Sequence, residues 1–208
     1  MKLCIFSVLA FAMVMSGCSA PMKDTAEASN QPDAPQRLTM NVATEVTAPT
    51  ATGSILDSMI PVSGCLMTRN GDVLQLAAPT PDRSLVQTTA TFRPPFVFRL
   101  RAKTDSTNLR LYYNAGMVIF NWECRQDQLR VHDPLTNQTR AVPGKGLIAP
   151  GKWHDVIWEV YPDRMSITVD DENRYSTPGN YANIDAAIGV GPAFGSVVSI
   201  ESIEVTAQ

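Results

Sequence analysis

Eight polar residues in the middle of the sequence carry the groups that a sugar-binding surface needs. Arginine presents a planar fork suited to carboxylate or sulfate, asparagine and glutamate can chelate neighbouring hydroxyls, and tyrosine offers a flat platform for a sugar ring. The set comprises Arg99, Arg101, Arg110, Tyr112, Asn121, Glu123, Arg130 and His132. We expect a ligand-binding face with a bias toward acidic sugars. The alternative is a solvated face of arginine–glutamate pairs, each worth under about 1 kcal/mol.

Acid–base catalysis has weaker support in the sequence. Hydrolysis of a glycosidic bond normally needs two carboxylates about 5–10 Å apart. Glu123 and Glu159, from different segments, are weak candidates for such a pair. His132 and His154 each precede an aspartate, but adjacent residues of a strand face opposite ways, which favours polar strand ends over an acid–base pair. We therefore expect binding without catalysis. We also expect no metal site, because the cysteines and histidines are not at ligand spacing.

Short alternating segments must position these side chains. From about Val62 onward, apolar and polar residues alternate and turn signals separate the segments, which predicts β-strands. Asn70-Gly71 between two such segments predicts a hairpin. We expect four segments to be neighbours in one sheet, so that the eight polar residues share a face: 96–103, 108–114, 117–124 and 128–132. The same alternation assigns Trp122 and Cys124 to the core.

The segment GKWHDVIWEVYPDRMSITVDDENRYS, residues 151–176, reads as a strand, a tight turn and a return strand, with Trp158 in the core and acidic residues in a second, solvated turn. It resembles the hairpin of concanavalin A-like lectin/glucanase sandwiches, including laminin-G-like domains. In those, a Gly-x-Trp-His-x-Val strand leads to a strand ending in Val-Asp-Gly; here Asp171 replaces the glycine. The resemblance covers roughly Asp72 to Val205.

The resemblance implies an all-β fold, a jelly-roll sandwich of two antiparallel sheets, one of them concave. The number and spacing of the strands independently predict an all-β sandwich. Members of the family bind glycans or proteins, or hydrolyse polysaccharides. Its glucanases carry a Glu-x-Asp-x-x-Glu strand, which this sequence lacks. Many members hold calcium in loops. The second turn offers oxygens, but it supplies too few converging ligands by itself: Asp170, Asp171, Glu172 and Asn173. We therefore expect no cofactor, with calcium as the minor alternative.

The first residues predict export. MKLCIFSVLAFAMVMSGCSA has a lysine followed by an apolar run that is short for a membrane span, as in a signal peptide. Its end, Met15-Ser16-Gly17-Cys18, resembles a bacterial lipobox, which implies cleavage before Cys18 and acylation of that cysteine. Two or three acyl chains give stable anchoring. The alternative is ordinary secretion with Cys18 as a spare thiol.

These features divide the chain into a signal peptide (1–17), a lipidated Cys18 with a disordered, flexible linker (18–61) and a sandwich domain (62–208). The linker is rich in Ala, Thr, Pro and Ser and poor in aromatics, so it cannot bury enough apolar area to fold. Cys4 leaves with the signal peptide. Cys65 and Cys124 could then form a disulfide, and two buried free thiols are the alternative.

The formal net charge of −3 and the lack of a basic tract exclude nucleic acid as an expected partner. The leading hypothesis is a lipoprotein anchored to a bacterial membrane, on its periplasmic side or at the cell surface, with a non-catalytic domain that binds polysaccharide or glycoconjugate. One alternative is a glycan hydrolase or lyase of the same fold. Another is a structural or protein-interaction module at the cell surface.

Overall fold

The computed structural model describes residues 54–80 and 84–208. The expected signal peptide, Cys18 and most of the expected linker lie outside the described residues. The elements are η1 (Leu56–Ser58), β1 (Met59–Ser63), β2 (Leu66–Asn70), β3 (Val73–Ala77), β4 (Leu85–Thr88), β5 (Phe96–Thr104), β6 (Leu109–Tyr113), β7 (Gly116–Phe120), β8 (Leu129–His132), β9 (Thr139–Val142), β10 (His154–Val160), β11 (Arg164–Val169), β12 (Glu172–Pro178), β13 (Ile188–Gly191) and β14 (Val197–Ala207).

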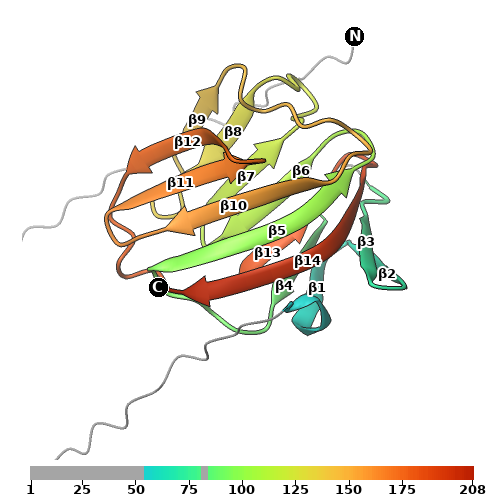
Figure 1. Cartoon of the computed structure of the whole chain (residues 1–208), viewed down its shortest axis with the longest axis horizontal. Coiled ribbons are helices and arrows are strands. Elements are labelled where there is room, and N and C mark those ends of the chain that lie inside the picture. The colour runs from blue at the N-terminus through green and yellow to red at the C-terminus, as the bar shows by residue number, and fades with distance from the viewer. Residues whose placement is uncertain (1–53, 81–83) are drawn as a thin grey trace, which may run out of the picture. The chain divides into compact units, whose positions relative to one another are not determined.

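The strands form two antiparallel sheets that pack face to face (Figure 1). Sheet A has the order β1-β4-β13-β6-β7-β8-β9, and sheet B has the order β12-β11-β10-β5-β14-β3-β2. In Figure 1 the long strands of sheet B lie in front of the strands of sheet A. The expected all-β two-sheet sandwich is therefore confirmed.

The core between the sheets comes from alternate residues of the long strands. Phe96 and Phe98 of β5 are buried, as is Trp158 of β10. Tyr113 of sheet A meets Trp158 of sheet B edge to face, with ring centroids 6.3 Å apart, and meets Phe96 at 4.9 Å. Edge-to-face contacts suit the charge distribution of aromatic rings. Trp158 is thus a core residue, as the alternation predicts.

Residues with positive φ, in the left-handed backbone region, close the tight turns. The predicted hairpin at Asn70 forms: Asn70 pairs with Val73, and Gly71 has a φ of 62°. Asp170 and Asp171 connect β11 to β12 with φ values of 48° and 65°. Aspartate tolerates this region better than most residues because its short side chain can hydrogen-bond locally. The turn therefore forms with Asp171 in place of the glycine that the family often has.

The described residues include two elements, η1 and β1, that begin before the expected domain boundary at Val62. Leu56 of η1 and Met59 of β1 are buried in the core. β1 is an edge strand paired only with β4, and Ile60 and Val62 remain exposed on it. A strand that buries so few side chains shows little alternation in the sequence, which explains why the linker was expected to reach residue 61.

Candidate functional site

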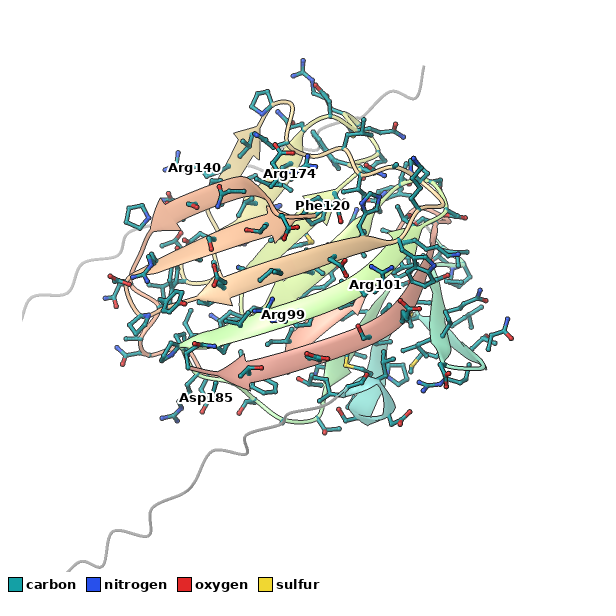
Figure 2. All side chains as sticks on the ribbon, in the orientation of Figure 1. Arg99, Arg101, Phe120, Arg140, Arg174 and Asp185 are labelled. Carbon is teal, nitrogen blue, oxygen red and sulfur yellow. The ribbon has the colours of Figure 1, made fainter. Side chains whose placement is uncertain are left out.

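The chain crosses from one sheet to the other between β5 and β6, and this separates the predicted site residues. Arg99 and Arg101 lie on β5, in sheet B, as Figure 2 shows. Arg110, on β6, lies in sheet A, and so do the residues on β7 and β8. The expectation that all four segments are neighbours in one sheet is therefore wrong. Alternation assigns a side chain to a face of its strand, but it does not say to which sheet the strand belongs.

The two arginines of sheet B belong to a solvated surface. Arg101 Nη1 lies 2.9 Å from Asp155 Oδ2, and its Nε contacts Glu201. Hydrogen bonds to Asp155 and Glu201 raise the pKa of Arg101. Arg99 is exposed. The side chains on this face are those of an ordinary wet surface with cross-strand ion pairs, which contribute little to stability.

Sheet A presents two rows of side chains on its outer face. In the first row, Met117 of β7 pairs with Tyr112 of β6 and with His132 of β8. Paired residues in neighbouring strands point to the same side of a sheet. The second row is parallel to the first and consists of Arg110, Ile119 and Arg130. Four of the eight predicted residues therefore share a face: Arg110, Tyr112, Arg130 and His132.

The middle of this face is apolar. Tyr112, Met117 and Ile119 are buried and form a cluster separate from the main core, with Leu85 and Trp122 packed against it. We refer to these five residues as the outer cluster. Leu85 and Trp122 are its partly exposed members, and apolar side chains flanked by hydrogen-bonding groups are typical of a ligand site. The outer cluster therefore distinguishes this face from the wet face of sheet B.

Trp122 lies on the outer face and not in the core, which corrects the expected assignment. Asn121, directly before it, has a φ of 48°. β7 ends at Phe120, so the alternation of side chains between the two faces stops there. The face that alternation assigns to Trp122 is therefore not the face on which it lies. Asparagine is enriched among residues with positive φ. The Phe-Asn-Trp sequence was therefore a signal that the alternation ends at Asn121.

Asn121 belongs to the segment 117–124 that the sequence predicts as a strand, but it lies just past the end of β7 and does not reach the outer face. Its side chain is fully buried. Its Nδ2 donates to the carbonyl oxygens of Ile148 at 2.9 Å and Ser106 at 3.2 Å, and its Oδ1 accepts from the Ile148 N–H at 2.9 Å. Asn121 therefore holds two loops against the end of β7, and its polar atoms are used for structure.

Two arginine side chains of the second row, Arg110 and Arg130, flank the outer cluster. The Arg130 guanidinium stacks on Trp122, with Cζ 4.1 Å from the ring centre. A cation over a tryptophan face is a favourable contact. Arg110 is 6% exposed, and its Nη2 lies 3.4 Å from Glu123 Oε2. Glu123 therefore contacts a residue of the outer face, Arg110.

A hollow opens at the other end of the outer cluster. Its volume is about 290 Å³, and Leu85, Tyr112 and Gly189 line it. Gly189 pairs with Tyr112 but contributes no side chain to the face. A Cβ at this position would come within 2.5 Å of Leu85 Cδ1. Leu85 occupies the space that a side chain at position 189 would need, and the hollow beside Tyr112 is where an extended ligand could continue.

The candidate pair of catalytic carboxylates does not form. Glu159 lies on β10 in sheet B, where Ser166 Oγ donates to its Oε2 at 2.7 Å. Glu123 follows β7 of sheet A. The two carboxylates belong to different sheets with the core between them, so they cannot flank one glycosidic bond.

The acidic turn after β11 serves the fold. His154 Nδ1 lies 2.6 Å from Asp170 Oδ2, and the Asp155 N–H donates to Asp170 Oδ1. Burial opposes the ionisation of Asp170, but these hydrogen bonds outweigh it and lower its pKa. A hydrogen bond from Lys145 lowers the pKa of Glu172. Within residues 54–80 and 84–208, no three His, Cys, Asp or Glu side chains converge to hold a metal ion.

The two cysteines of the domain do not pair with each other. Cys65 is a free thiol, so the disulfide considered between Cys65 and Cys124 is not formed. Burial raises the pKa of the Cys65 thiol to about 11, which keeps it protonated and unreactive at neutral pH. No helix in the described part of the chain is long and apolar enough to cross a membrane.

Several solved structures share this fold. A β-glucanase from Bacillus licheniformis aligns with a TM-score of 0.56 and 10% identity, over 76% of this chain and 94% of its own. The carbohydrate binding module CBM66 from Bacillus subtilis aligns with a TM-score of 0.55 and 10% identity, over 72% and 96%. A Bacillus subtilis protein of unknown function with a galectin-like fold aligns with a TM-score of 0.60 and 7% identity, over 72% and 89%.

These matches confirm a concanavalin A-like sandwich. A sialidase also aligns, with a TM-score of 0.54 and 13% identity, and this chain spans 18% of its length. At such low identities the likeness shows the fold alone. No family model matches the sequence, and no curated protein sequence matches it. Carbohydrate-binding modules and glycoside hydrolases share this fold. The role of this chain therefore has to be inferred from the residues on the outer face of its own sheet A.

Proposed function

We propose that the protein binds a polysaccharide or glycoconjugate, without cleaving it, on the outer face of sheet A. The observation that carries the proposal is Trp122, a partly exposed member of the outer cluster, with the Arg130 guanidinium stacked on its ring. Sugar rings have apolar C–H faces and polar edges, so they suit aromatic surface next to hydrogen-bonding groups. The names of two structures with the same fold state carbohydrate binding and glucanase activity, which makes this ligand class reasonable.

A preference for acidic sugars would depend on fewer cations than the sequence suggests. Arg99 and Arg101 are on sheet B, and Arg110 is next to Glu123. Arg130 and His132 remain as the groups of the outer face that could meet a carboxylate or sulfate. Arg130 is half-buried, and its Nε is enclosed without a hydrogen-bond partner among the described residues, so hydrogen bonds to a ligand would come from its terminal nitrogens.

A matched pair of arginine variants tests the proposal. We expect Arg130→Ala to weaken binding to an array of neutral and acidic oligosaccharides about tenfold, through loss of charged hydrogen bonds worth about 1.5 kcal/mol. Arg99→Ala removes the same side chain from the outer face of sheet B and should bind like the wild type. Binding unchanged in Arg130→Ala, or lost equally in Arg99→Ala, would contradict the proposed face. Release of reducing ends from a bound glycan would establish the hydrolase alternative.

We also propose that Cys18 is lipidated and anchors the domain to a bacterial membrane, where it would meet envelope or surface glycans. The lipobox-like end of the apolar N-terminal run supports this address. In a bacterial host, metabolic labelling with an alkyne fatty acid should mark the wild type, and Cys18→Ala should abolish the label. A wild-type protein that is unlabelled and released into the soluble fraction would support ordinary secretion.

A further inference from the structure

The turn between β13 and β14 holds a bulky side chain in an unfavourable backbone conformation. Phe194 and Gly195 have φ values of 55° and 78°. Two consecutive positive values define a turn that prefers Asn-Gly. The Ser196 hydroxyl donates to Ala193 O at 2.8 Å and accepts from the Ala193 N–H at 3.2 Å, which fixes the turn. Phenylalanine is strained there, and such strain gathers at functional sites.

The strained turn places an exposed ring beside the outer face of sheet A. Phe194 is 48% exposed, so burial does not explain its position. The Arg110 guanidinium carbon lies 5.5 Å from the centre of its ring. The turn therefore offers an aromatic surface to solvent at the Arg110 end of the second row. A sugar ring could stack on the side that the guanidinium leaves open.

Unused hydrogen-bonding capacity surrounds the same guanidinium. Arg110 Nε and Nη2 donate to Asn108 Oδ1 at 3.0 and 2.7 Å. Asn108 is fully buried, and its Nδ2 has no hydrogen-bond partner among the described residues. Because this Nδ2 is enclosed, it cannot meet a ligand, and Asn108 serves to hold the Arg110 guanidinium in place. The Glu123 carboxylate next to Arg110 has a side chain that is 22% exposed, so it can accept a further hydrogen bond.

We infer that Phe194, Arg110 and Glu123 form an end subsite that binds one neutral sugar ring of the glycan, with the buried Asn108 supporting Arg110 from behind. The inference rests on the proposed function and adds the class of sugar. The apolar face of the ring stacks on Phe194. One hydroxyl of the ring donates a hydrogen bond to the partly exposed carboxylate of Glu123. A uronate is disfavoured because its carboxylate would lie near that of Glu123.

Two substitutions of Phe194 separate stacking from folding. Glycine has no penalty at positive φ, so Phe194→Gly should raise the melting temperature by a few degrees. It should also weaken binding to the neutral oligosaccharides of the array about tenfold, by loss of the stacking surface. Phe194→Tyr retains the ring and should bind like the wild type. A gain in stability combined with a loss of binding is the expected signature, since mere damage to the fold would lower both.

Glu123→Gln tests the hydrogen bond. Glutamine keeps the size of the side chain and an oxygen for Arg110, but it removes the charge that makes Glu123 a strong hydrogen-bond acceptor. Binding to neutral oligosaccharides should fall about fivefold. Unchanged binding in both Phe194→Gly and Glu123→Gln, with binding lost in Arg130→Ala, would overturn the subsite alone. If the wild type binds no glycan, the proposed function fails as well. A loss confined to uronate oligosaccharides would overturn the assignment of a neutral sugar.

Discussion

Replacing Trp122 with alanine is expected to weaken glycan binding about thirtyfold or more. Trp122 packs on the outer cluster and carries the Arg130 guanidinium on its ring. Removing it takes away the largest aromatic surface of the face and the support that orients Arg130. Truncation of a central aromatic anchor typically costs about 2 kcal/mol or more, and each 1.4 kcal/mol corresponds to about tenfold in affinity.

Trp153 provides a matched control for this prediction. It also carries a cation on its ring, with Lys103 Nζ 4.7 Å from the ring centre. Lys103 belongs to β5, so this pair lies on the sheet B side of the sandwich. Titration of both variants with the tightest-binding oligosaccharide of the array should show a loss for Trp122→Ala and none for Trp153→Ala. Equal affinities of the two variants would refute a site on the outer face of sheet A.

Asn121→Ala is expected to destabilise the domain by about 3 kcal/mol. The substitution removes three hydrogen bonds and leaves polar backbone groups of Ile148 and Ser106 without partners, two of them in buried bonds. Each unsatisfied buried group costs about 1–3 kcal/mol. Alanine at a φ of 48° adds about 1 kcal/mol of backbone strain. The total is large because structural hydrogen bonds and backbone conformation are lost together.

Asn114→Ala separates the backbone contribution from the hydrogen bonds. Asn114 has a φ of 51°, and its Nδ2 donates to Pro134 O at 2.7 Å, but the residue is exposed. Water can replace this hydrogen bond, so the expected loss is about 1 kcal/mol. Urea unfolding followed by circular dichroism measures both variants. If Asn121→Ala costs no more than Asn114→Ala, the role assigned to the buried amide is wrong.

The two predictions concern neighbouring residues, Asn121 and Trp122, which have different roles. The alternation in the sequence predicted neither role correctly. It named Asn121 as a ligand residue and Trp122 as a core residue. The structure has Asn121 buried in loop contacts and Trp122 on the outer face. Both errors have one origin, because the alternation was extended past Phe120, where β7 ends. Phe194 was missed for a related reason: a single aromatic residue in a glycine-rich turn has no periodicity.

Local alternation by itself determined which side chains of each strand face the core. Trp158, Phe96 and Phe98 are buried as expected, and Arg99 and Arg101 face outward. Successive residues of an extended strand point to opposite sides whatever the strand pairs with, so this information is local. The turn at Asn70 is also local, since its conformation depends on the few residues that form it.

Only the tertiary structure decided which strands share a sheet. β5 pairs with β10 and β14, far along the sequence, while β6 pairs with β7 and with β13. Such pairings are set by the packing of the whole sandwich and by where the chain crosses between sheets. They placed Arg99 and Arg101 on the opposite surface from Arg110 and Arg130. They also brought the turn that carries Phe194 next to Arg110, across a sequence separation that no local pattern records.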